Sequence, residues 1–391
     1  MTLPNPAPNA EPRRVCVLGA TGSVGINTLD MLERNRDAFV VDVLTANTNA
    51  ELLAAQAKSM DARLAVVADE TKYNELKSAL SGTSIEAAAG TAAIADAAAE
   101  PTDWVMAAIV GAAGLAPTLE AVRRGATIAL ANKECLVSAG EIFTREVTSH
   151  GATLLPVDSE HSAIYQVFDF EHADRVKRVI LTASGGPFLT RSIEDMRDVS
   201  VAEAVAHPNW DMGAKISIDS ATMMNKGLEL IEAYHLFPVD KSQIEILVHP
   251  QSVIHSMVEY VDGSVLAQLG TPDMRTPIAY AMSWPGRIDC PSPRLALDKI
   301  ATLTFEKPDS IRFPALRLAR EALEQGGAAP TILNAANEIA VQRFLDGEIA
   351  FLDICRIVEK TLEKVPNTAI NTLADVTDAD QEARKVAQKT P

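Results

Sequence analysis

The sequence predicts an α/β protein with an N-terminal doubly wound parallel sheet, a central α+β domain and a C-terminal helical domain. Residues 14–157 alternate short β-branched runs with helical segments, which is typical of parallel sheets covered by helices. Residues 158–285 mix both patterns and include a hairpin over 258–269. Residues 286–313 carry several prolines and predict a linker, and residues 314–391 are helical with a break at Gly326-Gly327.

Six short apolar runs supply the strands of the N-terminal sheet, at residues 14–18, 39–44, 64–67, 105–110, 127–130 and 153–157. A helix is expected over 26–32, after the first strand and the turn that follows it. The nearly all-alanine stretch 86–100 suits a surface helix or a helix followed by a loop, because alanine has the highest helix propensity.

A glycine-rich turn, GATGSVG at residues 19–25, joins the first strand to the first helix. Glycines in this position permit a tight bend and close approach of the backbone to a pyrophosphate, and the helix N-terminus offers free N–H groups to the anion. The turn therefore predicts a Rossmann-like nucleotide site. An ordinary strand-to-helix turn remains the alternative.

The segment LLPVDSEH, residues 154–161, ends an apolar strand in two carboxylates, a hydroxyl and an imidazole. Asp158 and Glu160 stand two residues apart, so a turn beyond the strand end can aim both at one hard divalent cation such as Mg²⁺ or Mn²⁺. A solvated acidic loop is the alternative, since Asp and Glu are mostly exposed.

A second polar cluster lies in SIDSATMMNKGLELIE, residues 217–232, which reads as one helical pattern. Asn225 and Lys226 stand about one turn before Glu229, so an amide, an ammonium and a carboxylate share one surface. That surface suits both a phosphate and a metal ion. A surface helix with a Lys226–Glu229 ion pair is the alternative, but the apolar residues among them predict a buried helix, namely Met223, Met224, Leu228 and Ile231.

Three further segments carry candidate ligand-binding groups. Lys133 follows the strand 127–130, where parallel sheets bind ligands outside their carboxyl ends, although a stray surface lysine is the usual default. Ser184 lies among glycines after a strand at 178–181, which fits either a phosphate nest or a plain turn. The loop HPNWDMG, residues 207–213, fits a flap that closes over a ligand or a loop around a buried Trp210. His255 alternates with apolar neighbours and predicts a core or supporting histidine.

Composition excludes several classes of protein. The net charge of −17 argues against non-specific nucleic-acid binding, and no stretch is long and apolar enough to predict a membrane span. Residues 1–13 lack the apolar core of a secretory signal and predict a disordered leader. Four cysteines without metal-ligand spacing indicate a reducing compartment, so we expect a cytoplasmic protein.

The chain resembles the 1-deoxy-D-xylulose 5-phosphate reductoisomerases. The motifs that carry the resemblance follow one another from residue 14 to about residue 340, and the longest of them, DSATMMNKGLE, is highly specific. They are GATGSVG, ANKE (131–134), PVDSEH, ASGGPF (183–188), HPNWDMG, DSATMMNKGLE, HPQSVIHSMV (249–258) and NAANE (334–338). Two alternative functions remain to be weighed. Another Rossmann oxidoreductase with an added metal domain does not explain DSATMMNKGLE. A non-catalytic nucleotide sensor predicts the loss of polar site residues, but the full set is present.

The resemblance implies an NADPH-dependent enzyme that isomerises and reduces 1-deoxy-D-xylulose 5-phosphate to 2-C-methyl-D-erythritol 4-phosphate, and that forms a homodimer. It implies a catalytic role for the central domain and a supporting role for NAANE. Mg²⁺, Mn²⁺ or Co²⁺ would be held by Asp158, Glu160 and Glu229. Lys133 joins these three as a catalytic residue. The substrate would contact Lys133, Ser159, Glu160, Ser184, His207, Trp210, Ser220, Asn225, Lys226 and Glu229. NADPH would contact Thr21, Gly22, Ser23, Val24, Ala46, Asn47, Asn49, Asn132, Glu134 and Gly213.

One segment departs from the family pattern. After the second strand the chain reads Thr45-Ala46-Asn47-Thr48-Asn49, where the family usually has a glycine, a basic residue and an asparagine. No cation is therefore placed to hold the 2′-phosphate of NADPH. No acidic residue ends the strand either, and the two asparagines and the threonine donate neutral hydrogen bonds. We expect a preference for NADPH that is weaker than in a relative with a basic residue.

Overall fold

The computed structural model describes residues 11–210 and 212–391. The predicted leader 1–13 falls mostly outside this range, and its last residue, Arg13, already belongs to a strand. Contacts divide the chain into two compact units. The N-terminal unit comprises the described part of Met1–Asn132 with Glu146–Leu155 and Ile278–Cys290, and the C-terminal unit comprises Lys133–Arg145, Pro156–Pro277 and Pro291–Pro391.

A seven-stranded sheet forms the centre of the N-terminal unit, in the order β4-β3-β2-β1-β5-β6-β7. The ladders that join β4 through β6 are all parallel. Strand order reverses direction at β1, as in doubly wound folds, so the predicted fold class is confirmed. The strands are β1 (Arg13–Leu18), β2 (Phe39–Ala46), β3 (Leu64–Val67), β4 (Glu86–Ala89), β5 (Trp104–Ala107), β6 (Thr127–Leu130) and β7 (Thr153–Pro156).

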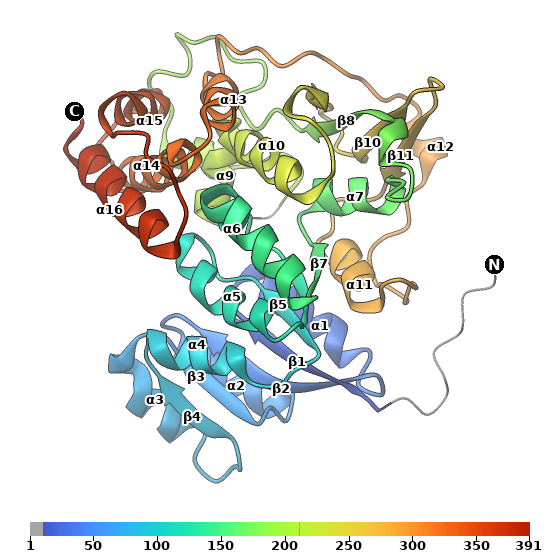
Figure 1. The fold of residues 1–391 in the computed structure, drawn as a ribbon, viewed down its shortest axis with the longest axis vertical. Helices are drawn as coiled ribbons and strands as arrows, with labels where there is room; N and C mark the ends of the chain where they lie inside the picture. The colour runs from blue at the N-terminus through green and yellow to red at the C-terminus, as the bar shows by residue number, and fades with distance from the viewer. Residues whose placement is uncertain (1–10, 211) are drawn as a thin grey trace. The chain divides into compact units, whose positions relative to one another are not determined.

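Helices connect these strands, as Figure 1 shows in blue and cyan. They are α1 (Ser23–Glu33), α2 (Ala50–Ser59), α3 (Tyr73–Ala79), α4 (Thr91–Ala99) and α5 (Leu115–Arg123), with short 3₁₀ turns at Glu70–Lys72 and Ala112–Gly114. The prediction of a helix over 86–100 is wrong in its first part. Four of those residues form edge strand β4, and Gly90, with φ of 104°, ends it before α4 begins. Strand β5 also ends earlier than predicted, because Val110 lies exposed in the loop beyond it.

The C-terminal unit contains a mixed four-stranded sheet in the order β11-β10-β8-β9. Its strands are β8 (Val176–Ala183), β9 (Ile244–Val248), β10 (Ile254–Tyr260) and β11 (Val265–Leu269). Strands β10 and β11 form the predicted antiparallel hairpin, with Gly263 at φ of 86° in its turn. Strand β8 is antiparallel to β10 and parallel to β9.

Five helices of this region position the polar motifs. They are α6 (Glu134–His150), α7 (Ser159–Val167), α8 (Val201–Val205), α9 (Ala214–Ala221) and α10 (Met224–Leu236). The prediction of one helix over 217–232 is wrong, because Met223 adopts a left-handed conformation with φ of 63° and separates α9 from α10. The predicted burial is confirmed, since Met223, Met224, Leu228 and Ile231 all belong to the main core.

The C-terminal helices are confirmed and include the predicted break, where Gly326 and Gly327 both have positive φ. They are α13 (Ala315–Gln325), α14 (Ala329–Leu345), α15 (Asp353–Lys364) and α16 (Leu373–Lys389). Helix α14 packs against α15 and α16, and α13 packs against α10, as Figure 1 shows in orange and red. Two shorter helices are α11 (Arg275–Ser283) and, within 286–313, α12 (Leu297–Ile300). Among the described residues, no helix is both long enough and apolar enough to cross a bilayer.

Candidate active site

The glycine turn after β1 forms a cradle that only glycine permits. Gly19 has φ of 89°, and a Cβ added there would lie 2.7 Å from the Ala108 carbonyl oxygen. A Cβ on Gly25 would lie 2.3 Å from the Gly19 carbonyl oxygen. Helix α1 then begins after Gly22. Among the described residues, no side chain caps the first N–H groups of this helix. The turn thus fits a pyrophosphate at a helix N-terminus. It contains four of the predicted cofactor residues, Thr21, Gly22, Ser23 and Val24.

The segment after β2 lies at the same edge of the sheet, because β1 and β2 are adjacent and parallel. Ala46 is buried, whereas Asn47 and Thr48 are exposed beyond the strand. The Asn49 side chain caps α2 by accepting a hydrogen bond of 3.1 Å from Leu52 N. Asn47 and Thr48 are therefore exposed at this edge, whereas the side-chain oxygen of Asn49 is engaged in the helix cap.

Asn132 follows β6 by two residues at this edge too, and its side chain holds the loop after β5. Its Nδ2 donates to the carbonyl oxygen of Gly111 at 2.9 Å and to that of Ile109. The side chain is only 3% exposed. Asn132 thus shapes the loop that borders the predicted nucleotide position.

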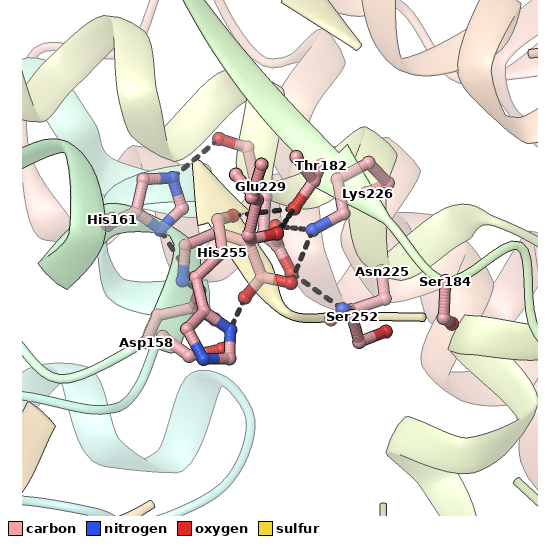
Figure 2. Close-up of polar contacts among 12 residues, drawn as sticks. Asp158, His161, Thr182, Ser184, Asn225, Lys226, Glu229, Ser252 and His255 are labelled. Carbon is pink, nitrogen blue, oxygen red and sulfur yellow. Dashed lines mark hydrogen bonds and ion pairs between the residues drawn. The ribbon is translucent and has the colours of Figure 1, made fainter. Parts of the chain in front are cut away.

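Three carboxylates converge in the C-terminal unit, and Figure 2 labels two of them, Asp158 and Glu229. Asp158 caps α7, and its side chain accepts a hydrogen bond of 3.3 Å from Glu160 N. The Glu160 side chain accepts a hydrogen bond of 2.6 Å from Ser159 Oγ. Glu229 projects from α10 and is fully buried. One oxygen atom from each of Asp158, Glu160 and Glu229 lies within 4.8 Å of the others, which suits the oxygen ligands of a hard divalent cation.

Two lysines share these carboxylates. Lys133 Nζ donates to Asp158 Oδ2 at 2.6 Å, to Asn225 Oδ1 at 2.7 Å and to Glu229 Oε1 at 3.2 Å. Lys226 Nζ lies 2.9 Å from Glu160 Oε1 and also pairs with Glu229. Both ammonium groups are buried, so their charges compensate carboxylates that would be costly to bury alone.

The electrostatics of this cluster follow from burial and proximity. Burial alone would lower the pKa of Lys133, but the carboxylates of Asp158 and Glu229 outweigh burial and hold that pKa well above its usual value. Burial favours the protonated Asp158, but Lys133 and His161 hold the pKa of its carboxyl well below the usual range. Burial and the charge of Asp158 raise the pKa of Glu229.

A second buried pair, His161 and Glu232, lies beside Asp158. His161 Nδ1 lies 3.3 Å from Asp158 Oδ1 and 3.2 Å from Glu232 Oε2, while its Nε2 lies 2.9 Å from the Glu229 carbonyl oxygen. The three residues Asp158, His161 and Glu232 form another group with ligand-type atoms within 4.8 Å. His161 and Glu232 are fully buried, so we assign them to holding Asp158 and α10 in place.

A group of polar side chains around Ser184 lies in the same unit, and Figure 2 shows Ser184 at the edge of the drawn residues, opposite His161. Ser184 Oγ lies 2.9 Å from His207 Nε2 and accepts a hydrogen bond of 3.1 Å from Gly186 N. A Cβ on Gly186 would lie 2.6 Å from the Ser220 carbonyl oxygen, so this turn also lies against Ser220. The glycine-rich turn thus holds Ser184 and lies against the backbone of Ser220.

His207 is oriented by its own loop. Its Nδ1 accepts hydrogen bonds from Asn209 N at 3.1 Å and Trp210 N at 3.0 Å, so the neutral ring carries its proton on Nε2. Burial lowers the pKa of His207, which favours that neutral form. Asn209 Nδ2 donates to Pro250 O at 2.8 Å and to Ser252 Oγ at 3.2 Å, and these contacts anchor the loop.

Trp210 lies beside His255 with 6.1 Å between ring centroids, and both rings line a small cavity with Ser159. The predicted burial of His255 is confirmed, since the residue is 7% exposed. The tip of the loop therefore lies close to Ser159, the residue that follows Asp158. Asp211, in the same loop, lies outside the described residues.

The predicted residues divide between the two units. The C-terminal unit brings together Lys133, Asp158, Ser159, Glu160, Ser184, His207, Ser220, Asn225, Lys226 and Glu229. Glu134 and Gly213 also belong to this unit, where Gly213 starts α9 and Glu134 pairs with Lys215. The sequence assigns no role to Asn209, Ser252 or Lys215, although Asn209 and Ser252 lie within the motifs HPNWDMG and HPQSVIHSMV and so carry a local signal.

Three family models match the chain. The model described as 1-deoxy-D-xylulose 5-phosphate reductoisomerase matches residues 15–140, and two models of its C-terminal domains match residues 154–237 and 269–386. A 1-deoxy-D-xylulose 5-phosphate reductoisomerase of Rhodospirillum centenum is 63% identical over 96% of this chain and 94% of the relative. That of Zymomonas mobilis is 59% identical over 96% of this chain and 97% of the relative.

Solved structures agree with these matches over the full length. The Zymomonas mobilis enzyme in complex with NADPH is 57% identical, with a TM-score of 0.92, and the match covers 96% of this chain and 98% of that one. A reductoisomerase in complex with NADPH, fosmidomycin and magnesium is 43% identical, with a TM-score of 0.91 and coverage of 96% and 97%.

Proposed function

Because the chain belongs to the 1-deoxy-D-xylulose 5-phosphate reductoisomerase family, we propose how its residues divide the family's reaction among them. That reaction is the NADPH- and divalent-metal-dependent isomerisation and reduction of 1-deoxy-D-xylulose 5-phosphate to 2-C-methyl-D-erythritol 4-phosphate. The observation that carries the proposal is the convergence of three carboxylates and two ammonium groups beside a cluster of phosphate-type donors.

Asp158, Glu160 and Glu229 hold Mg²⁺, Mn²⁺ or Co²⁺. Their donor set consists of carboxylate oxygens within 4.8 Å of one another, which is the chemistry that hard divalent cations prefer. The bound ion supplies Lewis-acid chemistry to the ketone and the adjacent hydroxyl of the substrate. Lys133 lies among the same oxygens and is the group nearest to the reacting carbons, together with Ser159 and Glu160.

Five residues bind the substrate phosphate, namely Ser184, His207, Ser220, Asn225 and Lys226. His207 donates from Nε2 as a neutral ring, and the backbone around Gly186 adds an anion-binding turn. Lys226 contributes a charge-assisted contact. Trp210 closes over the substrate, because it occupies a loop anchored by Asn209 and stands above the residues after Asp158. Closure excludes water and strengthens the charged contacts beneath it.

NADPH, which supplies the hydride, binds at the carboxyl ends of strands β1 and β2. The cradle of Gly19 and Gly25 supports this, since a Cβ at either position would collide with backbone. Pyrophosphate contacts come from Thr21, Gly22, Ser23 and Val24, and Asn47 donates to the 2′-phosphate without charge. Further contacts come from Ala46, Asn49, Asn132, Glu134 and Gly213.

We further propose the domain division 14–157 for NADPH binding, 158–285 for metal, substrate and catalysis, 286–313 as a linker and 314–391 as the helical domain. The family models that begin at 15, 154 and 269 support separate segments. A homodimer is supported by β11, an edge strand on which Val265, Leu266 and Leu269 are 48%, 48% and 37% exposed. A cytoplasmic location is supported by the four cysteines, which are joined by no disulfide in the described residues.

The site assignment is tested by titrating a molecule that joins a hydroxamate to a phosphonate. Each end addresses one subsite, since the hydroxamate chelates the cation and the phosphonate takes the place of the substrate phosphate. Lys226→Met should weaken binding by about tenfold or more, as loss of a buried charged contact does, and Trp210→Ala should speed release while Mn²⁺ binding stays unchanged. Lys177→Met, on the exposed side of β8, is the control. Equal affinities in all four proteins would show that subsite and flap are misassigned.

A further inference from the structure

One of the two asparagines in the NAANE motif forms a hydrogen bond to helix α9. Asn337 Nδ2, on α14, donates a hydrogen bond of 2.8 Å to Asp219 Oδ1 on α9, and the bond is buried. Asn334 Nδ2 instead donates at 3.0 Å to Glu338, four residues on in the same helix. Both asparagines are 0% exposed. Two identical side chains in one motif therefore make different connections, one between helices and one within a helix.

The connection continues from Asp219 to the start of α6. Asp219 Oδ2 lies 2.8 Å from Lys215 Nζ, and Lys215 Nζ lies 3.1 Å from Glu134 Oε1. The side chains of Asp219 and Glu134 are 2% and 7% exposed, and that of Lys215 is 24% exposed. A polar chain thus runs from Asn337 through Asp219 and Lys215 to Glu134, which adjoins the catalytic Lys133.

Opposite charges hold this chain together. Burial alone would raise the pKa of Glu134, but Lys215 lowers it, so the carboxylate stays ionised. Burial would lower the pKa of Lys215, and the carboxylates of Asp219 and Glu134 raise it instead. One ammonium between two buried carboxylates leaves one negative charge, and the amide of Asn337 is the neutral donor that faces it. Removing Asn337 leaves the Asp219 carboxylate without its amide donor, and removing Lys215 leaves two buried carboxylates without their ammonium.

Helix α9 has few other restraints at its amino end. Gly213 precedes it in open space, since a Cβ added there would meet nothing within 4 Å among the described residues beyond its chain neighbours. No described side chain caps the helix either. The loop of His207 and Trp210 leads directly into this end. Lys215, which belongs to the first turn of α9, and Asp219 one turn later are therefore the polar restraints on this end of the helix.

We propose that Lys215, Asp219 and Asn337 are positioning residues, through which the C-terminal helices fix Glu134 and the amino end of α9 for cofactor binding. The inference rests on the proposed function, in which Glu134 and Gly213 contact NADPH. It gives the NAANE motif a defined task, since Asn337 supports the site without touching substrate, metal or cofactor.

Two measurements on the full-length protein test this inference. Hydrogen exchange of the α9 amides, without any ligand, reports local opening of the helix, and a fluorescence titration gives the Kd for NADPH. Asn337→Ala should speed exchange in α9 and raise the NADPH Kd about fivefold or more, as the loss of a buried hydrogen bond does. The Kd for Mn²⁺ should change less than about twofold, because the metal ligands lie outside this chain.

Asn334→Ala is the matched control, because it removes an equally buried amide of the same motif and should change neither reading. Asp219→Asn, which keeps the size of the side chain, replaces Asn337→Ala if the latter fails to fold and should have the same two effects. Equal effects of Asn337→Ala and Asn334→Ala would overturn the inference and reduce both asparagines to packing.

Glu134→Gln separates the inference from the proposed function beneath it. If Glu134→Gln weakens NADPH binding and Asn337→Ala does not, the positioning role is wrong and the cofactor site stands. If Glu134→Gln leaves the NADPH Kd unchanged, Glu134 is not a cofactor residue, and both assignments fall.

Discussion

Lys133 Nζ donates a hydrogen bond of 2.6 Å to Asp158 Oδ2, at the centre of the carboxylate cluster. The ammonium therefore competes with a metal ion for the same oxygen atoms, and it also offsets the repulsion between the carboxylates of Asp158 and Glu229. Coulomb repulsion between the ammonium and a bound cation must lower the affinity for the cation. Lys133 therefore stabilises the site in the absence of metal and weakens the binding of the metal ion.

Lys133→Met should therefore lower stability without metal and raise the affinity for metal. Unpaired buried carboxylates typically cost about 3–5 kcal/mol, so we expect a fall in Tm of several degrees. Added Mn²⁺ should raise Tm by more in Lys133→Met than in the parent, because binding to the folded state adds to its stability. Turnover should be lost. A smaller Mn²⁺-induced shift in the variant, measured by differential scanning fluorimetry, would contradict the shared-carboxylate arrangement.

Glu229→Gln should keep the fold but weaken Mn²⁺ binding by at least about tenfold, a loss that even supporting partners of metal ligands can cause. The side chain keeps its size, and its hydrogen bond from Asn225 Nδ2 can persist at 2.6 Å. Glu232→Gln is the control on the same face of α10 and should affect Mn²⁺ binding less. If isothermal titration gives the larger loss for Glu232→Gln, the third ligand is Glu232, as part of the group with His161.

Asn47→Arg should widen the preference for NADPH over NADH by about tenfold. Charge-assisted hydrogen bonds are roughly twice as strong as neutral ones, and Asn47 is exposed at the edge of the sheet where the 2′-phosphate is expected. Asn74→Arg adds the same charge on α3 and should leave the ratio unchanged. The measurement is kcat/KM with each cofactor. An unchanged ratio in Asn47→Arg would place the 2′-phosphate elsewhere.

Acid should destabilise the protein partly through His235, on α10. Burial lowers the pKa of His235 to about 4, and Lys241 adds to the effect. The unfolded chain takes up this proton near pH 6.5, so the stability due to the neutral ring is full above that pH and is lost as pH falls to about 4. His235→Gln should lose less stability between pH 7.5 and pH 4.5 in urea unfolding. Equal losses in both proteins would mean that the ring titrates normally.

The sequence predicts those parts of the fold that local pattern controls. The buried β-branched runs predict five of the seven N-terminal strands closely, because short β-branched runs bounded by turn residues favour buried strands over helices. The strand β4 escapes prediction, since its three alanines carry a helical preference and only pairing with β3 makes them a strand. The break at Met223 escapes too. It depends on tertiary packing of Met223 in the core and not on a glycine or proline.

The site divides in the same way. Asp158, Glu160, Asn225 and Glu229 can be predicted because each stands in a short motif at a strand end or on a helix face. The link from Asn337 to Asp219 spans 118 residues of sequence, and nothing local to either residue indicates the other. Burial also changes the interpretation of single residues. Lys133 reads as a substrate ligand in sequence, whereas its three hydrogen bonds show that it also neutralises the cluster.

We infer that a divalent cation held by Asp158, Glu160 and Glu229 is required for the reduction of 1-deoxy-D-xylulose 5-phosphate. The direct measurement is NADPH oxidation, followed by absorbance, with the purified protein and this substrate before and after removal of metal by a chelator. We predict that chelation abolishes turnover and that added Mn²⁺ or Mg²⁺ restores it. Turnover that persists after thorough chelation would contradict the account.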